Sequence, residues 1–196
     1  MANFRAIAAT SATLAGLIRD RYPRGEFGTA LDVQLYQTHD FEGPMKNGFS
    51  VFLYRIAING TVRNLTYRRT PDGRRFRPSL PLDLHYLITP WAEDTERQHR
   101  MLGWVMRMIE DVGVLSAGHL NHYIAETGTF SPVESVDVIC DPLVLNDYFT
   151  IWDRLGPKLP PSATYVLRMV LVDSDVSIED GPAVQTRRFD VGEVVA

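Results

Sequence analysis

Residues 81–112, PLDLHYLITPWAEDTERQHRMLGWVMRMIEDV, decide the fold that the chain is expected to adopt. Apolar and polar residues alternate over Leu82–Ile88, a pattern typical of a strand, and Thr89-Pro90 is expected to end that strand. Apolar residues at helical spacing then predict a helix from about Asp94 to Val112. The stretch therefore predicts a strand followed almost at once by a long helix.

The predicted helix has one apolar face, and its expected buried stripe consists of Leu102, Val105, Met106, Ile109 and Val112. Asp94 or Thr95 is expected to cap the first turn, where acidic side chains also favour the positive end of the helix dipole. Three arginines fall off the stripe and are expected to face solvent or a partner: Arg97, Arg100 and Arg107.

The same stretch raises a chemical alternative, a metal or acid–base site formed by Glu93, Asp94, Glu96 and His99. Glu96 and His99 are spaced to share one helix face. A metal site needs three or four ligands, however, and no second cluster of histidine or cysteine supplies them. The other histidines of interest lie in separate predicted segments: His85, His119 and His122. The interpretation as a capped helix is therefore favoured.

Further elements follow from the same periodicities. An amphipathic helix is expected over 4–21, with an apolar face of Phe4, Ile7, Ala8, Leu14, Leu17 and Ile18. Residues 49–67 predict a hairpin that turns at Asn59-Gly60. The remaining expected segments are strands at 30–36, 133–140 and 164–173 and helices at 117–125 and 145–156. Together they predict an α+β fold with a mostly antiparallel sheet of four or five strands, flanked by about three helices.

The composition is that of an ordinary globular domain, with 196 residues, 45% hydrophobic and 22% charged. The net charge of −4 gives no argument for nucleic acid or an anionic membrane as partner. No apolar run reaches the roughly 18 residues that a membrane span needs, and the start lacks the pattern of a secretory signal. The one cysteine, Cys140, excludes an intrachain disulfide, suits a reducing compartment and is expected to be a small buried hydrophobe.

Two segments differ from the rest of the expected core domain, which spans 1–175. The first is a basic loop at 61–80, which contains Arg63, Arg68, Arg69, Arg74, Arg75 and Arg77. It is open to three interpretations: nucleic-acid contact, a solvated loop, or contact with an acidic protein surface. The acidic net charge and the few aromatic residues favour protein contact over nucleic acid.

The second segment is an expected C-terminal arm at 176–196. It carries acidic residues, Gly181-Pro182 and one alternating piece, AVQTRRFDVGEVV, at 183–195. Such a piece forms a strand only if it finds a sheet edge. Candidate partner-binding residues in this arm are Arg187, Arg188 and Phe189.

Motifs of nucleophilic or cofactor chemistry are missing from the sequence. We find no G-x-S-x-G elbow, no phosphate-binding loop and no dinucleotide glycine fingerprint. The sequence therefore predicts a protein that is not an enzyme and has no catalytic residue, cofactor or metal.

Three groups of residues are the most distinctive in the sequence: Leu84-His85-Tyr86-Leu87 with Thr89-Pro90-Trp91, His99 with Gly103-Trp104, and Ile151-Trp152 with Gly156-Pro157-Lys158. In these pieces the chain resembles a known family, the N-terminal domain of the cap, or tail-terminator, proteins of phage-tail-like contractile injection systems. The openings IAATSATLAGLIRD and FSVFLYRIAINGTVRN are also similar, so the resemblance covers roughly residues 4–173.

The resemblance implies a structural role. Such proteins form a hexameric ring that closes the end of the inner tube and sheath and fixes the particle length. The implied partners are other copies of the chain and tube or sheath subunits, without nucleic acid or membrane, and the implied location is the cytoplasm during assembly and then the particle. The alternative is an assembly chaperone or binding module that leaves before the particle is complete.

Overall fold

The structure is a computed structural model, and it describes residues 2–28, 30–62, 65–126, 128–156 and 159–178. The helices are α1 (Ala6–Arg21), α2 (Arg24–Phe27), the short 3-10 helix η1 (Thr38–Glu42), α3 (Thr95–Val112), α4 (Ala117–His122) and α5 (Leu145–Leu155). The strands are β1 (Asp32–Leu35), β2 (Gly48–Ile58), β3 (Arg68–Arg69), β4 (Arg75–Phe76), β5 (Leu80–Trp91), β6 (Val114–Ser116), β7 (Ser135–Cys140) and β8 (Ala163–Val172).

Six of these strands form one sheet in the order β1-β2-β5-β8-β7-β6. The β1–β2 pair is parallel and every other pair in this sheet is antiparallel. The α+β class is therefore confirmed. The predicted count of four or five strands is wrong, and the sheet expected to be mostly antiparallel is a mixed one with one parallel pair. The three-residue β6 is too short to give a period-2 signal, and the parallel pair depends on the η1 connection.

The hairpin predicted at Asn59-Gly60 is wrong. The strand β2 ends at Ile58 and pairs with β5, more than twenty residues further along the chain. Asn59 is buried, and its side chain donates to both carboxylate oxygens of Asp83 at 3.1 and 3.0 Å. The side-chain oxygen of Asn59, Oδ1, accepts the backbone N–H groups of Thr61 and Val62. This local turn directs the chain away from the sheet instead of reversing it.

The strand β5 runs through Thr89-Pro90 to Trp91, so the predicted end at the proline is wrong. On one side Pro90 pairs with Phe49 of β2. On its other side no strand of the described residues pairs with it, because the pairing of β5 with β8 ends at Ile88. The carbonyl of Pro90 accepts Gln98 Nε2 at 2.8 Å, which places the proline nitrogen on the same open side. No ladder donor is therefore lost.

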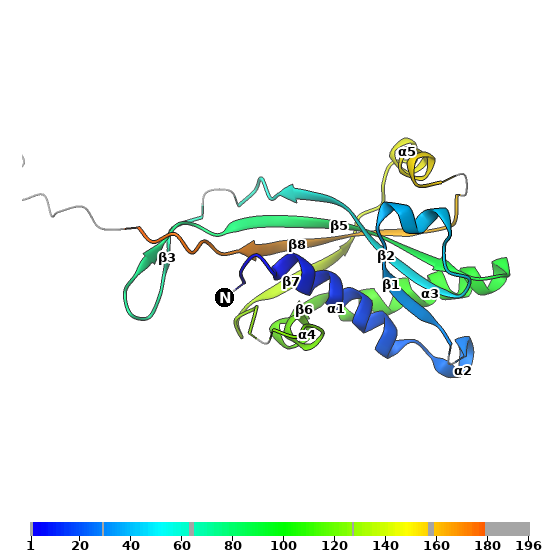
Figure 1. Ribbon diagram of the computed structural model, residues 1–196, viewed down its shortest axis with the longest axis horizontal. Helices are drawn as coiled ribbons and strands as arrows, with labels where there is room; N and C mark the ends of the chain where they lie inside the picture. The colour runs from blue at the N-terminus through cyan, green and yellow to red at the C-terminus, as the bar shows by residue number, and fades with distance from the viewer. Residues whose placement is uncertain (1, 29, 63–64, 127, 157–158, 179–196) are drawn as a thin grey trace, which may run out of the picture.

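The main core lies between the curled sheet and the helices α1, α3 and α4 (Figure 1). The helix α1 is almost completely buried from Ala9 to Ile18 and is joined to β5 by a buried hydrogen bond of 2.7 Å between Ser11 Oγ and Tyr86 OH. Burial raises the pKa of Tyr86. Two residues of the predicted apolar face, Phe4 and Ala8, are exposed.

The helix α3 confirms the predicted element and its cap, because Asp94 Oδ1 accepts the Arg97 N–H at 2.7 Å. The buried face is rotated from the predicted stripe. Val105 and Ile109 are buried as expected, but Met106 is 39% exposed. The side chains that complete the buried face are Met101 and Met108. Methionine is a flexible side chain that fills gaps in a core, so the helical period alone did not show which of the three methionines are buried.

A smaller core lies on the other face of the sheet, beneath α5 and η1 (Figure 1). It consists of Tyr36, Phe41, Leu87, Trp91, Trp152 and Leu155. Cys140, predicted to be buried, is exposed at the end of β7. None of the described helices combines the length and hydrophobicity that crossing a bilayer requires.

Candidate partner-binding surface

The basic segment forms a two-stranded ribbon of β3 and β4 that projects from the end of the main sheet (Figure 1). The turn is Thr70-Pro71-Asp72-Gly73, in which Gly73 donates to the Thr70 carbonyl at 2.9 Å. Proline suits the second position of such a turn, and Gly73 has a φ of +87° that other residues rarely adopt. This Pro-Asp-Gly sequence was the signal that would have predicted a hairpin here.

Arg68 is part of the base of the ribbon. Its Nη2 donates to the Ser174 carbonyl at 3.2 Å, its Nε lies 3.6 Å from Asp173, and its guanidinium stacks 4.5 Å from the Phe76 ring. Asp173 also accepts Ser79 Oγ at 2.5 Å, and its N–H donates to the Ala2 carbonyl. Arg68, predicted as a partner-binding residue, therefore joins the ribbon to both ends of the described chain.

Tyr67 lies between two arginines. The guanidinium of Arg69 is 5.4 Å from its ring and that of Arg75 is 5.0 Å away. Arg69 also donates to the Tyr67 hydroxyl at 3.1 Å. These two positive groups lower the pKa of Tyr67 below its ordinary value, because they stabilise the phenolate. The predicted set of arginines missed this exposed tyrosine, which organises two of them.

Two predicted arginines, Arg74 and Arg77, have exposed side chains. Arg74 pairs with the neighbouring Asp72 at 3.0 Å across the turn. The Thr70 hydroxyl, followed by Arg74, lowers the pKa of Asp72. The predicted residue Arg63 lies outside the described residues, as do Arg187, Arg188 and Phe189.

The start of the predicted C-terminal arm pairs with this ribbon. Ser177 forms an antiparallel bridge with Phe76, and the flanking bonds join Arg77 N–H to the Val176 carbonyl at 3.0 Å and Ile178 N–H to the Arg75 carbonyl at 2.7 Å. The chain after Asp173 is thus joined to β4 by one antiparallel bridge. We call the ribbon together with this segment, 67–78 with 174–178, the projecting arm.

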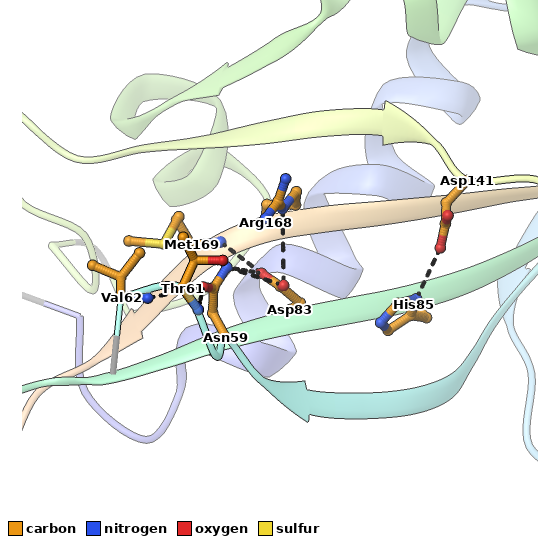
Figure 2. A network of polar contacts seen from close by, with 8 residues as sticks. All are labelled: Asn59, Thr61, Val62, Asp83, His85, Asp141, Arg168 and Met169. Atoms are coloured by element: carbon orange, nitrogen blue, oxygen red, sulfur yellow. Dashed lines mark hydrogen bonds and ion pairs between the residues drawn. The ribbon is translucent and has the colours of Figure 1, made fainter. Parts of the chain in front are cut away.

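The two strands of the main sheet that lead to the projecting arm, β5 and β8, contain a β-bulge held by Asp83 (Figure 2). The register of β5 and β8 shifts between Leu82 and Leu84, where Arg168 and Met169 both face Asp83. Met169 has a φ of +64°, and its N–H donates to Asp83 Oδ1 at 3.2 Å. Arg168 Nε lies 3.8 Å from the other carboxylate oxygen. One carboxylate therefore satisfies both the bulge of β8 and the turn after β2.

Towards the opposite end of the molecule, the small core borders a partly open cavity of about 300 Å³. Its lining includes Phe41, Trp91, Trp152 and Gly156. Phe41 lies edge-on to Trp152 with ring centres 5.6 Å apart, and Trp91 and Trp152 are 6.5 Å apart. The cavity brings together Trp91, Trp152 and Gly156 from the segments that carried the family resemblance. Distant segments of the sequence thus meet at this end.

The stretch considered for acid–base chemistry has a structural role. Glu93, Asp94, Glu96 and His99 are exposed, and Asp94 caps α3. Within the part of the chain that the structure describes, no three His, Cys, Asp or Glu side chains are close enough to share a metal ion. Trp104 packs against Phe27 and Phe49 at 6.1 and 5.8 Å between ring centres.

Of the three arginines of α3, Arg100 and Arg107 are exposed as expected and Arg97 is not. Arg97 turns inward, where Nη2 donates to the Phe27 carbonyl at 2.6 Å and to Asn47 Oδ1 at 3.1 Å. Arg100 pairs with Glu26 and Glu96 at 3.6 and 3.5 Å, and Arg107 with Asp111. Arg97 is therefore a structural residue that ties α3 to α2, contrary to the prediction that it faces solvent or a partner.

His85 has an environment of its own on the outer face of the sheet. Its side chain is largely buried, with Nδ1 3.3 Å from Asp141 Oδ2 and its ring 6.0 Å from that of Tyr54 (Figure 2). His119 belongs to the turn that starts α4, where its N–H donates to Ser116 Oγ, and His122 contacts Tyr123. These histidines thus lie in two elements, His85 in β5 and the pair His119 and His122 in α4.

Comparison with known proteins gives a matching family and similar solved structures, among them a terminator and a cap. The family model described as the Pvc16 N-terminal domain matches residues 9–186. The sheath/tube terminator of an extracellular contractile injection system, PVC, in its extended state has a TM-score of 0.56 at 18% identity, over 97% of this chain and 63% of that one. The tube-terminating cap of the anti-feeding prophage has a TM-score of 0.50 at 17% identity, over 95% and 60% respectively. No curated protein sequence matches.

At these identities the two likenesses show a shared fold. The chain spans less than two thirds of the length of either solved terminator chain.

Proposed function

This chain belongs to the Pvc16 N-terminal domain family, and on that premise we propose that it is a structural cap of a contractile injection system. In this role it closes the end of the tube or sheath, contacts the subunits of the last layer, and performs no catalysis. The observation that carries the proposal is the agreement between the family match and the fold, which the chain shares over 97% of its length with a sheath/tube terminator.

The proposed assembly is a homohexameric ring. A ring needs a heterologous contact, in which two different surfaces of the subunit meet. The projecting arm and the cavity beside Trp91 lie at opposite ends of the elongated molecule, so the subunit has two distinct ends to offer to its neighbours (Figure 1). We propose that the ring assembles in the cytoplasm, becomes part of the particle, and binds neither nucleic acid nor membrane.

Within this role we assign docking on tube or sheath to the outer side of the projecting arm. Arg69, Arg74 and Arg77 are exposed there, whereas Arg68 holds the base of the arm. Exposed arginines on a protruding ribbon suit a partner surface rich in carboxylates, because guanidinium groups bind carboxylates with two parallel hydrogen bonds. The start of the expected C-terminal arm, 176–178, pairs with β4, which lies within the expected core domain of 1–175. We therefore treat these two expected parts as joined at this point.

The position of the chain in purified particles tests the proposal. We expect a tagged full-length chain to remain with the particles through purification and to be found at one end of each by electron microscopy. An assembly chaperone would be absent from particles by mass spectrometry, and a tube or sheath subunit would be labelled along the whole length. Either result would contradict the cap.

A further inference from the structure

One stretch of β2 has an open edge. The parallel partner β1 covers only Gly48–Val51, while β2 continues to Ile58. In the described chain no strand pairs with the outer side of Phe52–Ile58, and Figure 1 shows this stretch along the border of the molecule. A bulge interrupts β2 at Tyr54, so the regular part of the open edge is Arg55–Ile58.

The hydrogen bond just after the end of β2 shows which of its backbone groups point outward. Asn59 N–H donates inward to the Pro81 carbonyl of β5 at 2.9 Å. Because successive residues of a strand direct their backbone groups to alternate sides, Ile58 and Ile56 direct theirs outward. An unpaired row of this kind is a template for another strand, and proteins usually protect it with charges, prolines or a covering element.

The side chains at this edge are apolar and exposed. Ile56 is 49% exposed and Ile58 is 53% exposed, and both lie on the same face as their buried partners Leu84 and Leu82. Leu80, diagonal to Ile58 on β5, is 44% exposed. A strand that pairs with β2 here would cover both isoleucines and extend the main core beyond α1.

The C-terminal segment has the properties of such a strand. The 18 residues 179–196 follow Ile178, which pairs at the far end of the projecting arm, away from the main sheet. Fully extended they span at most about 60 Å. In the alternating piece 183–195, Phe189 and Val191 are two residues apart, the same spacing as Ile56 and Ile58, so in a strand they would share one face.

We propose that the open edge of β2 at Arg55–Ile58 accepts the segment 183–195 of a second copy of this chain as an added strand. The second copy is favoured because the described chain heads away from its own β2 at Ile178, and because a tail on one subunit and an edge on the next form a heterologous contact that closes a ring. The inference rests on the proposed ring-forming function and gives that ring a specific contact.

The test is complementation in solution with full-length chains. The edge variant Ile56→Lys/Ile58→Lys keeps an intact tail, and the tail variant Phe189→Lys/Val191→Lys keeps an intact edge. We expect the wild-type chain to self-associate in analytical ultracentrifugation and each variant alone to lose roughly tenfold or more of that association. An equimolar mixture of the two is expected to form heterodimers and nothing larger, because only one productive contact remains.

The control is Ile139→Lys, which places the same charge on an exposed isoleucine of β7 that is 42% exposed and lies outside the proposed contact. Circular dichroism and the melting temperature verify that all variants fold. An edge variant that associates like the control would overturn the proposal, and so would a mixture without heterodimers or a wild-type chain that stays monomeric. The particle experiments test the cap independently, so complementation without a cap, or a cap without complementation, identifies which statement is wrong.

Discussion

Gly16 of α1 shows how a single residue controls packing between α1 and the segment after α4. A Cβ atom added at Gly16 would come within 2.2 Å of the Tyr123 ring. The Tyr123 hydroxyl donates to Asp20 at 2.8 Å, so the ring is held over the helix. We expect Gly16→Ala to lower the free energy of unfolding by about 1–3 kcal/mol, measured by urea denaturation.

The matched control is Gly103 in the exposed face of α3, where an added Cβ meets nothing within 4 Å. Gly103→Ala is expected to raise the free energy of unfolding by about 0.5–1 kcal/mol, because alanine restricts the unfolded chain and favours the helix. If both alanines have the same effect, the close approach of Tyr123 to α1 is wrong.

Buried tyrosines make the folded chain sensitive to alkali. Burial, and for Tyr123 the bond to Asp20, raise the pKa of Tyr54 and of Tyr123 to about 12. In the unfolded chain a tyrosine titrates near pH 10. The folded state thus binds more protons above that pH, and stability is expected to fall progressively from about pH 10 towards pH 12.

A pH titration checks this prediction: ultraviolet absorbance measures the ionised fraction of the tyrosines, and circular dichroism recorded at the same time measures the folded fraction. Exposed Tyr67, whose pKa is lowered, is expected to ionise first and without loss of structure. Ionisation of all the tyrosines at their ordinary pKa in a chain that remains folded would contradict the burial described for Tyr54 and Tyr123.

Among the elements, the projecting arm depends most on one side chain. Asp83 accepts both the Asn59 side chain and the Met169 N–H, and Asn59 is only 2% exposed. Removal of the carboxylate leaves these buried donors without an acceptor. We expect Asp83→Ala to lower the free energy of unfolding by about 1–3 kcal/mol. Hydrogen exchange is expected to become faster at Met169 and in the projecting arm, while the main core stays protected. The control Asp111→Ala removes an exposed ion pair of α3. It should change the free energy of unfolding by no more than about 0.5 kcal/mol and leave hydrogen exchange in the projecting arm unchanged.

The exposed arginines of the arm give a separate prediction. Arg74→Gln/Arg77→Gln is expected to weaken binding to purified tube or sheath by roughly 3–10-fold and to reduce its dependence on salt, because exposed charges contribute modest, screened attraction. The control Arg107→Gln removes an arginine that already pairs with Asp111 on α3. Equal binding by the wild type and both variants would show that the arginines of the ribbon do not contact the tube or sheath.

The elements differ in how far the sequence predicts them. Asp94, the apolar spacing of α3 and the run at 163–172 are local signals, and they predicted a helix, its cap and a strand. Asn59-Gly60 looked like a hairpin because the deciding contact, with Asp83, comes from another strand. Arg68 was predicted as part of a partner-binding loop, and its contact with Asp173, which lies far along the chain, has no local signal. Local patterns therefore miss contacts that come from distant parts of the chain.

At the scale of the whole molecule, the subunit is elongated, with the projecting arm at one end, the cavity beside Trp91 at the other, and an open β2 edge between them. These are different surfaces, and a contact between two different surfaces suits the closed ring that we propose for the end of a tube. The family match and the shared fold agree with that role.

The most direct test of the cap is the length distribution of particles made without this chain. Electron micrographs of particles from cells with and without it would be compared, with restoration by the wild-type chain as the control. We predict that particles made without the cap have widely varying lengths and unstable ends. Particles of normal, uniform length and normal stability in its absence would contradict the account.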